Sequence, residues 1–367
     1  MGSLLAAPVT TKVIEKYNED NFIASSVAVN GYRLSMEDTS QMVFRKGWAY
    51  GGVFDGHAGG DCSIFIADAI LKQLDKLDVD IASGELTNKI LKEICYRVDK
   101  EYMNTGGNSG TTATFFIAHS YMNDNCQLII ANIGDSRTML FNNDTALLAT
   151  VDHKPNDSEE YGRITKARGF VSHNRVNGQL AVSRAFGDRS YKDLDAISQA
   201  DYFDSAVTVK PDILRTSFTK DNVLVCCCDG MFESDCWSTH SIGNYVMDKI
   251  KLEDPKYLVA TLSQMAIDRG SKDNVSILLF RYKYPHEGGL LYQKETVVGP
   301  CLVPYAPNYM NAYTKMAELG GLTLIEALCQ RIQVVSAKYE QTDEKGGMTD
   351  ELILLHNIVN MTQSITK

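Results

Sequence analysis

The chain has 367 residues, of which 44% are hydrophobic and 22% charged, so it can bury a sizeable core and has the composition of an ordinary globular protein. Its formal net charge of −10, without a long run of Lys or Arg, argues against a nucleic-acid-binding protein, because phosphate contacts need clustered basic side chains. The nine cysteines have neither zinc-site nor disulfide spacing, which predicts reduced thiols in the cytoplasm, with the nucleus as the alternative compartment.

The N-terminus carries no clear targeting signal. No apolar stretch approaches the length of a transmembrane helix, and the first residues lack the charged-then-apolar order of a signal peptide. The chain begins with Met-Gly, as N-myristoylation requires, but Ala6 occupies the position where that motif has Ser or Thr. We therefore expect no transmembrane segment, and the sequence disfavours a lipid anchor while leaving it as the open alternative.

Short apolar or β-branched runs dominate the chain from Ser25 to Tyr282, with a few longer amphipathic stretches between them. Strands are predicted at 25–30, 39–44, 48–54, 111–118, 127–133, 136–141, 222–228 and 274–280. Helices are predicted at 63–77, 86–102, 239–250 and 255–269. Because the strands cluster in meanders and the helices lie between the clusters, the pattern favours an antiparallel α+β fold over a wound parallel sheet.

The composition changes after Tyr284. The stretch 285–313 reads as irregular connecting chain, because it contains PHEGG, GPCLVP and APNY. Apolar stripes at 322–335 and 352–359 then predict two helices that form a hairpin, packed on the main body or on a partner protein. The sequence therefore predicts a main domain at 1–284, followed at 285–367 by a connecting segment and a C-terminal helical extension.

Acidic residues stand at the ends of several predicted strands. Each of them alone is more typical of a turn or a helix cap, but together they suggest that strand ends deliver carboxylates to one rim. Carboxylates so close would repel one another unless a cation lay between them, and oxygen ligands are those that Mg²⁺ and Mn²⁺ select. The acids are, in chain order, Glu37, Asp38, Asp55, Asp135, Asp229 and Asp273.

Nine segments resemble, in order, the motifs of the metal-dependent serine/threonine protein phosphatases of type 2C, the PPM family. They are GYRLSMED, VFDGHAG, SGTTA, ANIGDSR, DHKP, RVNGQLAVSRAFGD, KPD, CDGMFE and GSKDN, and they span most of residues 20–283. Any one of them is a weak signal, whereas nine in the right order make an accidental match very improbable. The resemblance implies two antiparallel β-sheets packed face to face as a central sandwich, with α-helices on both outer sides and a metal cleft at one end. The domain at 1–284 would then be the catalytic domain.

The resemblance also implies a metal site. Asp55 would bridge two Mg²⁺ or Mn²⁺ ions, with the Gly56 carbonyl on one ion and with Asp229 and Asp273 on the other. Asp135 would host, together with Asp229, a third and more loosely held ion. Gly56 fits this role because a residue without a side chain lets its carbonyl approach a metal.

Four further residues are implied in catalysis. Glu37 and Asp38 would hold metal-coordinated waters, Arg33 would bind the substrate phosphate, and His57 would be the general acid. The ions would lower the pKa of a water enough to supply hydroxide, and a protonated imidazole would assist the poor alkoxide leaving group. A guanidinium suits the phosphate because it makes two parallel charge-assisted hydrogen bonds.

The predicted function is thus Mg²⁺- or Mn²⁺-dependent hydrolysis of phosphoserine and phosphothreonine in proteins. A cysteine-based phosphatase is excluded, because no Cys has Arg at the sixth position after it. Two alternatives stay open: a catalytically inactive relative that acts as a binding scaffold, and a metal-dependent phosphatase of small molecules.

Some matched residues are predicted to be structural, and some positions depart from the family pattern. Asp188 and His153 are expected to serve a turn and a hydrogen bond. Glu233 stands where the family has Asp, and Arg168 where it has Gly or another small residue, so we expect local effects on packing or substrate access. The acidic stretch 190–209 corresponds to a variable flap beside the cleft and is expected to bias substrate choice.

Overall fold

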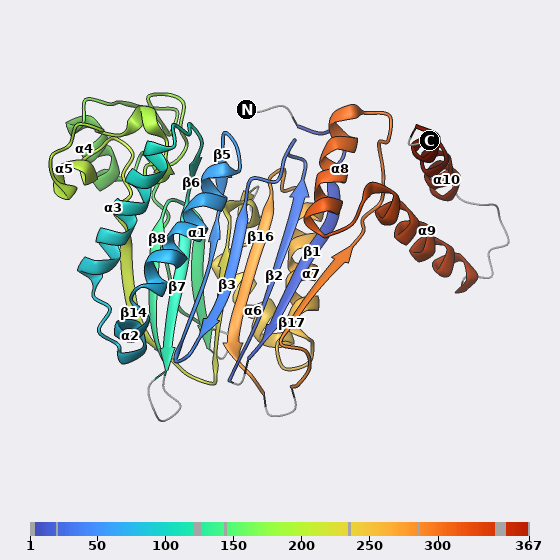
Figure 1. Cartoon of the computed structure of the whole chain (residues 1–367), viewed down its shortest axis with the longest axis horizontal. Coiled ribbons are helices and arrows are strands. Elements are labelled where there is room, and N and C mark those ends of the chain that lie inside the picture. The colour runs from blue at the N-terminus through green and yellow to red at the C-terminus, as the bar shows by residue number, and fades with distance from the viewer. Residues whose placement is uncertain are drawn as a thin grey trace.

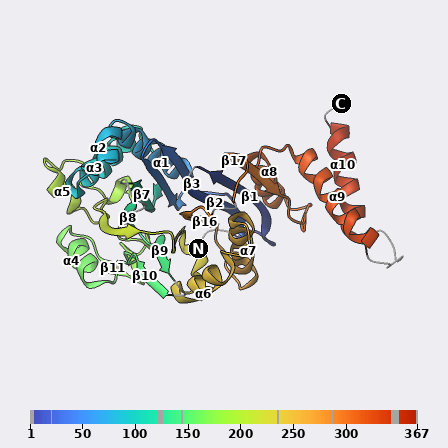
Figure 2. The same ribbon diagram turned by 90° about the horizontal axis from the view of Figure 1, so that it is seen from below.

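Two antiparallel β-sheets packed face to face form the centre of the computed structural model, which describes residues 4–19, 21–120, 126–142, 145–233, 236–284, 287–341 and 350–365. Helices cover the outer face of each sheet (Figures 1 and 2). The expected α+β fold with a four-layer arrangement is therefore confirmed. No helix within these residues combines the length and the hydropathy that crossing a bilayer requires.

The larger sheet has seven strands in the order β10-β9-β15-β16-β2-β1-β17. Side chains alternate along β15, so that Leu224 and Cys226 point into the space between the sheets while Val225 and Cys227 face the helical layer. Burial on both faces explains why β15 and its neighbour β16 have continuous apolar sequences. The elements are β10 (Thr145–Ala149), β9 (Arg137–Asn142), β15 (Asn222–Cys227), β16 (Val275–Tyr282), β2 (Phe22–Gly31), β1 (Val9–Asn18) and β17 (Tyr292–Val297), covered by α6 (Thr239–Lys249) and α7 (Pro255–Asp268).

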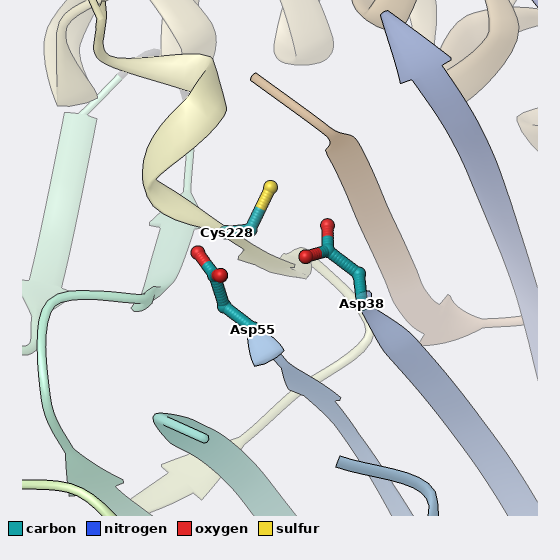
Figure 3. Close-up of side chains that lie close together, drawn as sticks. All are labelled: Asp38, Asp55 and Cys228. Carbon is teal, nitrogen blue, oxygen red and sulfur yellow. The ribbon is translucent and has the colours of Figure 1, made fainter. Parts of the chain in front are cut away.

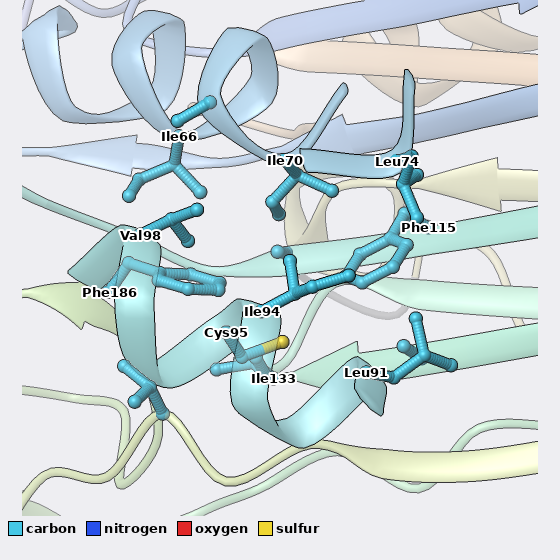
Figure 4. Close-up of a cluster of buried hydrophobic side chains, with 14 of the residues drawn as sticks. Ile66, Ile70, Leu74, Leu91, Ile94, Cys95, Val98, Phe115, Ile133 and Phe186 are labelled. Carbon is cyan, nitrogen blue, oxygen red and sulfur yellow. The ribbon is translucent and has the colours of Figure 1, made fainter. Parts of the chain in front are cut away.

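The smaller main sheet has five strands in the order β14-β8-β7-β4-β3. Apolar side chains at helical spacing, such as Ile66, Ile70 and Leu74, pack its outer face against two long helices (Figure 4). The strands are β14 (Asp212–Phe218), β8 (Cys126–Ile133), β7 (Ala113–Ser120), β4 (Trp48–Phe54) and β3 (Thr39–Arg45), and the helices are α1 (Asp61–Asp75), α2 (Asp78–Ser83) and α3 (Asn88–Asn104).

A flap of short elements lies beside one end of the sandwich. It contains α4 (Ser158–Lys166), β11 (Val171–Ser172), β12 (Arg175–Val176), the 3₁₀ turn η1 (Arg189–Tyr191) and α5 (Gln199–Phe203). Arg168 has a φ of +63° there, a left-handed conformation that explains why a small residue would suit this position better. A third, three-stranded sheet of β5 (Gly56–His57), β6 (Gly110–Thr111) and β13 (Phe186–Gly187) connects the flap to the sandwich.

The C-terminal region joins the body more closely than expected. The prediction of irregular chain at 285–313 is wrong in part, because β17 pairs with β1 and α8 (Pro307–Leu319) packs on the same strand. β17 has the sequence YQKETV and is largely exposed as an edge strand, so it lacks the apolar run that marks an inner strand. The two predicted helices are present as α9 (Leu324–Gln341) and α10 (Asp350–Ile365), which lie side by side and extend away from the sandwich (Figures 1 and 2).

Candidate metal and phosphate site

A cleft of about 710 Å³ opens where strand ends of both main sheets meet. Its wall contains every residue of the predicted site except Asp38, which lies just behind it. The predicted residues that line the cleft are Arg33, Glu37, Asp55, Gly56, His57, Asp135, Asp229 and Asp273.

The strand ends explain why these acids meet. Asp55 lies between β4 and β5, and Asp135 lies in the turn between β8 and β9. Asp229 begins η2 (Asp229–Met231) directly after β15, and Asp273 stands just before β16, the hydrogen-bonded neighbour of β15. Segments far apart in the sequence therefore deliver carboxylates from both layers to the same end of the sandwich.

Two glycines allow the acidic segments to approach one another. A Cβ atom on Gly56 would lie 2.3 Å from the carbonyl oxygen of Glu37, and one on Gly230 would lie 2.0 Å from that of Asn274. Neither distance leaves room for a side chain. In Asp55-Gly56 and Asp229-Gly230 the glycine therefore lets another backbone segment pack directly beside the acidic residue. Gly56 was expected to expose its carbonyl to a metal; in the structure it also makes room for the Glu37 segment.

The carboxylates raise one another's pKa values. Burial and the neighbouring Asp273 raise the pKa of Asp38 to about 7. Burial together with nearby carboxylates also holds the pKa values of Asp55 and Asp229 well above their ordinary range. The Oδ2 atom of Asp38 is buried and has no hydrogen-bond partner among the residues that the structure describes. Such unbalanced negative charge, carried by oxygen atoms, fits the binding of hard divalent cations.

Cys228 lies beside these acids without being a good metal ligand. Its Sγ atom and one carboxylate oxygen each of Asp38 and Asp55 lie within 4.8 Å of one another (Figure 3). Burial and the adjacent carboxylates raise the pKa of this thiol well above its usual value, so it stays protonated. The sulfur also accepts a hydrogen bond from the backbone N–H of Ser276, 3.2 Å away. Oxygen-selecting cations would therefore use the carboxylates, and Cys228 packs as a small buried hydrophobe.

Two basic side chains pair with the candidate ligands. The guanidinium of Arg33 forms an ion pair with Asp273, and 46% of its side chain is exposed at the mouth of the cleft. The Nζ atom of Lys154, from the DHKP segment, lies 2.5 Å from Oδ2 of Asp135. Lys154 thus balances the charge of Asp135, whereas Asp55 and Asp229 form no ion pair among the described residues.

His57 contacts Asp188, which the sequence predicts to be a structural residue in a turn. Its Nε2 atom lies 2.8 Å from Oδ2 of Asp188, whose side chain is 7% exposed. Gly110 makes this contact possible, because a Cβ atom there would lie 2.2 Å from Nε2 and 2.4 Å from Oδ2. Burial alone would lower the pKa of His57, but the charge and hydrogen bond of Asp188 outweigh it and raise the pKa.

The cleft contains further residues that were not predicted to belong to it. Glu233 and Arg175 line it, and Glu233 also accepts a hydrogen bond of 2.8 Å from the backbone N–H of Lys272. The departure at Glu233 is expected from the sequence to affect packing or substrate access, and its position after an Asp-Gly motif is the signal that places it near the site. His153 is a structural residue as expected, since it is buried and hydrogen-bonded through both ring nitrogens to Gly134 and Asp212.

Comparison with known proteins gives the family of this chain. The sequence model of the family "Protein phosphatase 2C" matches residues 24–275. The chain is 30% identical to "Protein phosphatase 2C homolog 2" of Aspergillus flavus over 71% of its own length and 62% of that protein. It is 33% identical to the protein of the same name from Hypocrea jecorina, over 67% of its own length and 57% of the relative. It thus spans less than two thirds of either fungal protein.

A solved structure shares the fold. It is that of a phosphatase from a pathogenic strain of Toxoplasma gondii, with a TM-score of 0.68, 24% sequence identity, and coverage of 78% of this chain and 100% of the other. The family match extends over well more than half of the chain and includes each of the candidate ligands. The chain belongs to the protein phosphatase 2C family.

Proposed function

We propose that the protein hydrolyses phosphoserine and phosphothreonine in proteins with the help of two Mg²⁺ or Mn²⁺ ions. The observation that carries this proposal is the convergence of Asp55, Asp229 and Asp273, with raised pKa values, in one cleft that also contains Arg33 and His57, while Asp38 lies beside Asp55. Buried acids with perturbed pKa values in a cleft are typical of functional sites.

Asp55, the Gly56 carbonyl, Asp229 and Asp273 would hold the two ions, and Glu37 and Asp38 would fix coordinated waters. When bound, the ions would supply a water of lowered pKa as nucleophile and would neutralise the phosphate charge. Asp135 is the candidate for a third ion, which would have to compete with the ammonium of Lys154.

Arg33 and His57 would act directly on the substrate. The Arg33 guanidinium, which is partly exposed in the cleft and paired with Asp273, would form two parallel hydrogen bonds to phosphate oxygens. Asp188 accepts a hydrogen bond from Nε2 of His57, so Nδ1 is the ring nitrogen left to donate a proton to the departing serine or threonine oxygen.

The proposal is tested by hydrolysis of a phosphothreonine peptide with Mn²⁺, with EDTA, and in an Asp229→Asn variant. We expect chelation to abolish the activity and Asp229→Asn to lower kcat/KM by at least about 100-fold. Asp221→Asn is the matched control, because Asp221 is exposed at the opposite end of the same strand, and it should keep full activity. Activity that survives EDTA or Asp229→Asn would contradict the proposal.

The alternatives make different predictions in the same preparation. A scaffold without activity would bind no Mn²⁺ in a calorimetric titration, and a phosphatase of small molecules would hydrolyse sugar phosphates faster than the peptide. Two further expectations remain predictions: a cytoplasmic location and a protein partner for the C-terminal helices. The nine cysteines, which all lie in the described part of the chain, form no disulfide, and all of them except Cys329 are buried.

A further inference from the structure

A groove of about 640 Å³ continues from the cleft between the sandwich and the flap. The cleft and the groove share His57 and Leu180 in their walls, so a bound molecule can pass from one into the other. Beyond these two residues the groove is lined by Ala58, Asn108, Gln179, Asp188, Arg189, Ser190, Tyr191 and Leu194.

The chemistry of the proposed reaction indicates on which side of the phosphate the substrate polypeptide lies. The inference that follows rests on the proposed function. A proton donor must lie within hydrogen-bond reach of the leaving oxygen, which is the side-chain oxygen of the phosphorylated residue. If His57 is that donor, the polypeptide attached to this oxygen lies on the His57 side of the phosphate. That is the side on which the groove begins.

The groove combines apolar and neutral polar side chains with one exposed positive charge. Leu180, Tyr191 and Leu194 contribute apolar surface, and the hydroxyl of Tyr191 donates to Oε1 of Gln179 at 3.2 Å. The carboxylate of Asp188 is paired with His57. Arg189 is then the exposed charged side chain among the described residues of the groove wall. Arg189 is oriented by a 2.6 Å hydrogen bond from Nη1 to the carbonyl oxygen of Met103.

Three acids of the flap line a neighbouring hollow. Asp193, Asp201 and Asp204 lie there together with Lys166, and this hollow shares Ser190 and Tyr191 with the groove. The expectation that the stretch 190–209 biases substrate choice stays a prediction, and Tyr191 and Leu194 of this stretch line the groove that contains His57.

We propose that this groove binds the residues that flank the phosphorylated Ser or Thr, and that it favours substrates with an apolar side chain and, at the Arg189 end, an acidic one. Arg189 and Leu194 are then specificity-determining residues. We infer that the substrate polypeptide occupies the groove because the groove adjoins the cleft at His57 and Leu180. We infer an acidic flanking residue because it would complement the charge of Arg189.

The test uses phosphothreonine peptides with alanine flanks, in which Glu, Lys or Leu replaces one flanking residue at a time on either side. For the wild-type protein with Mn²⁺ we expect Glu to exceed Lys in kcat/KM by about fivefold at one flanking position or more, as a partly exposed ion pair allows. Leu should exceed Ala by about fivefold to tenfold at another position.

Charge variants then identify the residue responsible. Arg189→Glu should invert the Glu-to-Lys preference, and Arg189→Gln, which keeps a donor for Met103, should abolish it without inversion. Lys166→Glu is the matched control, since it makes the same charge change on the same flap but at the other hollow. Each result is a ratio between two peptides measured on one preparation, so a partly misfolded variant cannot imitate it.

The outcomes separate this inference from the proposed function. Hydrolysis of the peptides without any flanking preference, or an Arg189→Glu variant that keeps the wild-type preference, would overturn the inference alone. Failure of the wild-type protein to hydrolyse both the peptides and p-nitrophenyl phosphate would overturn the proposed function, and the inference with it.

Discussion

Asp38 illustrates at the level of one residue how the cleft keeps unbalanced charge. The fold places the carboxylates of Asp38, Asp55 and Asp273, from three separate segments, close to one another. Because Asp38 is buried, water does not screen the repulsion between these negative charges. A pKa near 7 means that this group is about half protonated at neutral pH. A cation and a proton therefore compete for the same carboxylates.

This competition predicts that Mn²⁺ affinity rises with pH. A group with a pKa of about 7 is mostly protonated at pH 6 and mostly ionised at pH 8, so titration of Asp38 alone should tighten binding by about tenfold over this interval. Calorimetry in two buffers of different ionisation enthalpy would measure the affinity and the protons released. Asp38→Asn should weaken this dependence, and a wild-type affinity that is equal at both pH values would contradict the prediction.

The contact between His57 and Asp188 gives a second prediction. The carboxylate raises the pKa of His57, so Asp188→Asn should lower that pKa and leave the imidazole unprotonated at a lower pH. We expect the alkaline limb of the kcat profile to move to lower pH and kcat at pH 8 to fall by about tenfold, with Mn²⁺ affinity nearly unchanged. Asp193→Asn, on the same flap, is the control. An unshifted profile would mean that Asp188 only supports the backbone.

The site residues that could be predicted are those in motifs that occur together in the family order. Asp55 and Asp229 follow an apolar run and Asp273 precedes one, a pattern that is visible in the sequence. The contact between Asp188 and His57 could not be predicted, because it depends on the separation of β13 and β5 across β6 and on the absence of a side chain at Gly110. The pairing of Lys154 with Asp135 has the same origin in tertiary packing.

At the level of elements, helix α4 anchors the flap through one buried carboxylate. Glu160 accepts hydrogen bonds from Arg184 at 2.7 Å and from Ser183 at 2.6 Å, and it lies 2.8 Å from Arg163. Burial alone would raise the pKa of Glu160, but the two guanidinium groups outweigh it and lower the pKa to about 2. Arg184 extends the cluster to Asp212 at the start of β14.

Glu160→Gln should therefore destabilise the protein by about 3 kcal/mol at pH 7, because it removes the counter-charge of the largely buried Arg163 and leaves Arg184 with Asp212 alone. The ionised carboxylate stabilises the fold above its unfolded-state pKa of about 4.5, and this contribution is lost as the pH falls toward 2. The difference between wild type and variant, measured by urea unfolding, should shrink below about pH 4.5. Glu159→Gln, the exposed neighbour on α4, should change stability by less than about 0.5 kcal/mol.

The strands that could be predicted are those buried on both faces. β16 and β15 read as apolar runs because helices cover one face and the second sheet covers the other. β1 carries Lys12, Glu15 and Lys16, and β17 carries Lys294 and Glu295. The place of these two strands in the sheet depends on pairing with each other and on coverage by α8. A pattern of single residues cannot reveal that coverage.

For the whole molecule, the open question is how the C-terminal region relates to the catalytic body. The matched family region ends at residue 275, and the division at 284 into a catalytic domain and a helical extension remains a prediction. The structure nevertheless gives β1 and α8 a common core, in which Val9, Val13, Tyr309, Tyr313 and Met316 are buried. Strand β1 in turn pairs with β2 of the central sandwich. The body and α8 should then unfold together.

Tyr313→Ala tests this coupling. The side chain is fully buried, and its hydroxyl donates a 3.0 Å hydrogen bond to the carbonyl oxygen of Gly299, so its loss should cost about 3 to 5 kcal/mol. The chain has two tryptophans, Trp48 on β4 and Trp237 before α6, and both lie in the body. Their fluorescence in a urea titration should therefore report a lower unfolding midpoint for Tyr313→Ala, although the substitution is outside the family region. Tyr305→Ala removes a tyrosine that is 82% exposed and should leave the midpoint unchanged. If Tyr313→Ala also left the tryptophan midpoint unchanged, α8 would unfold independently of the sandwich.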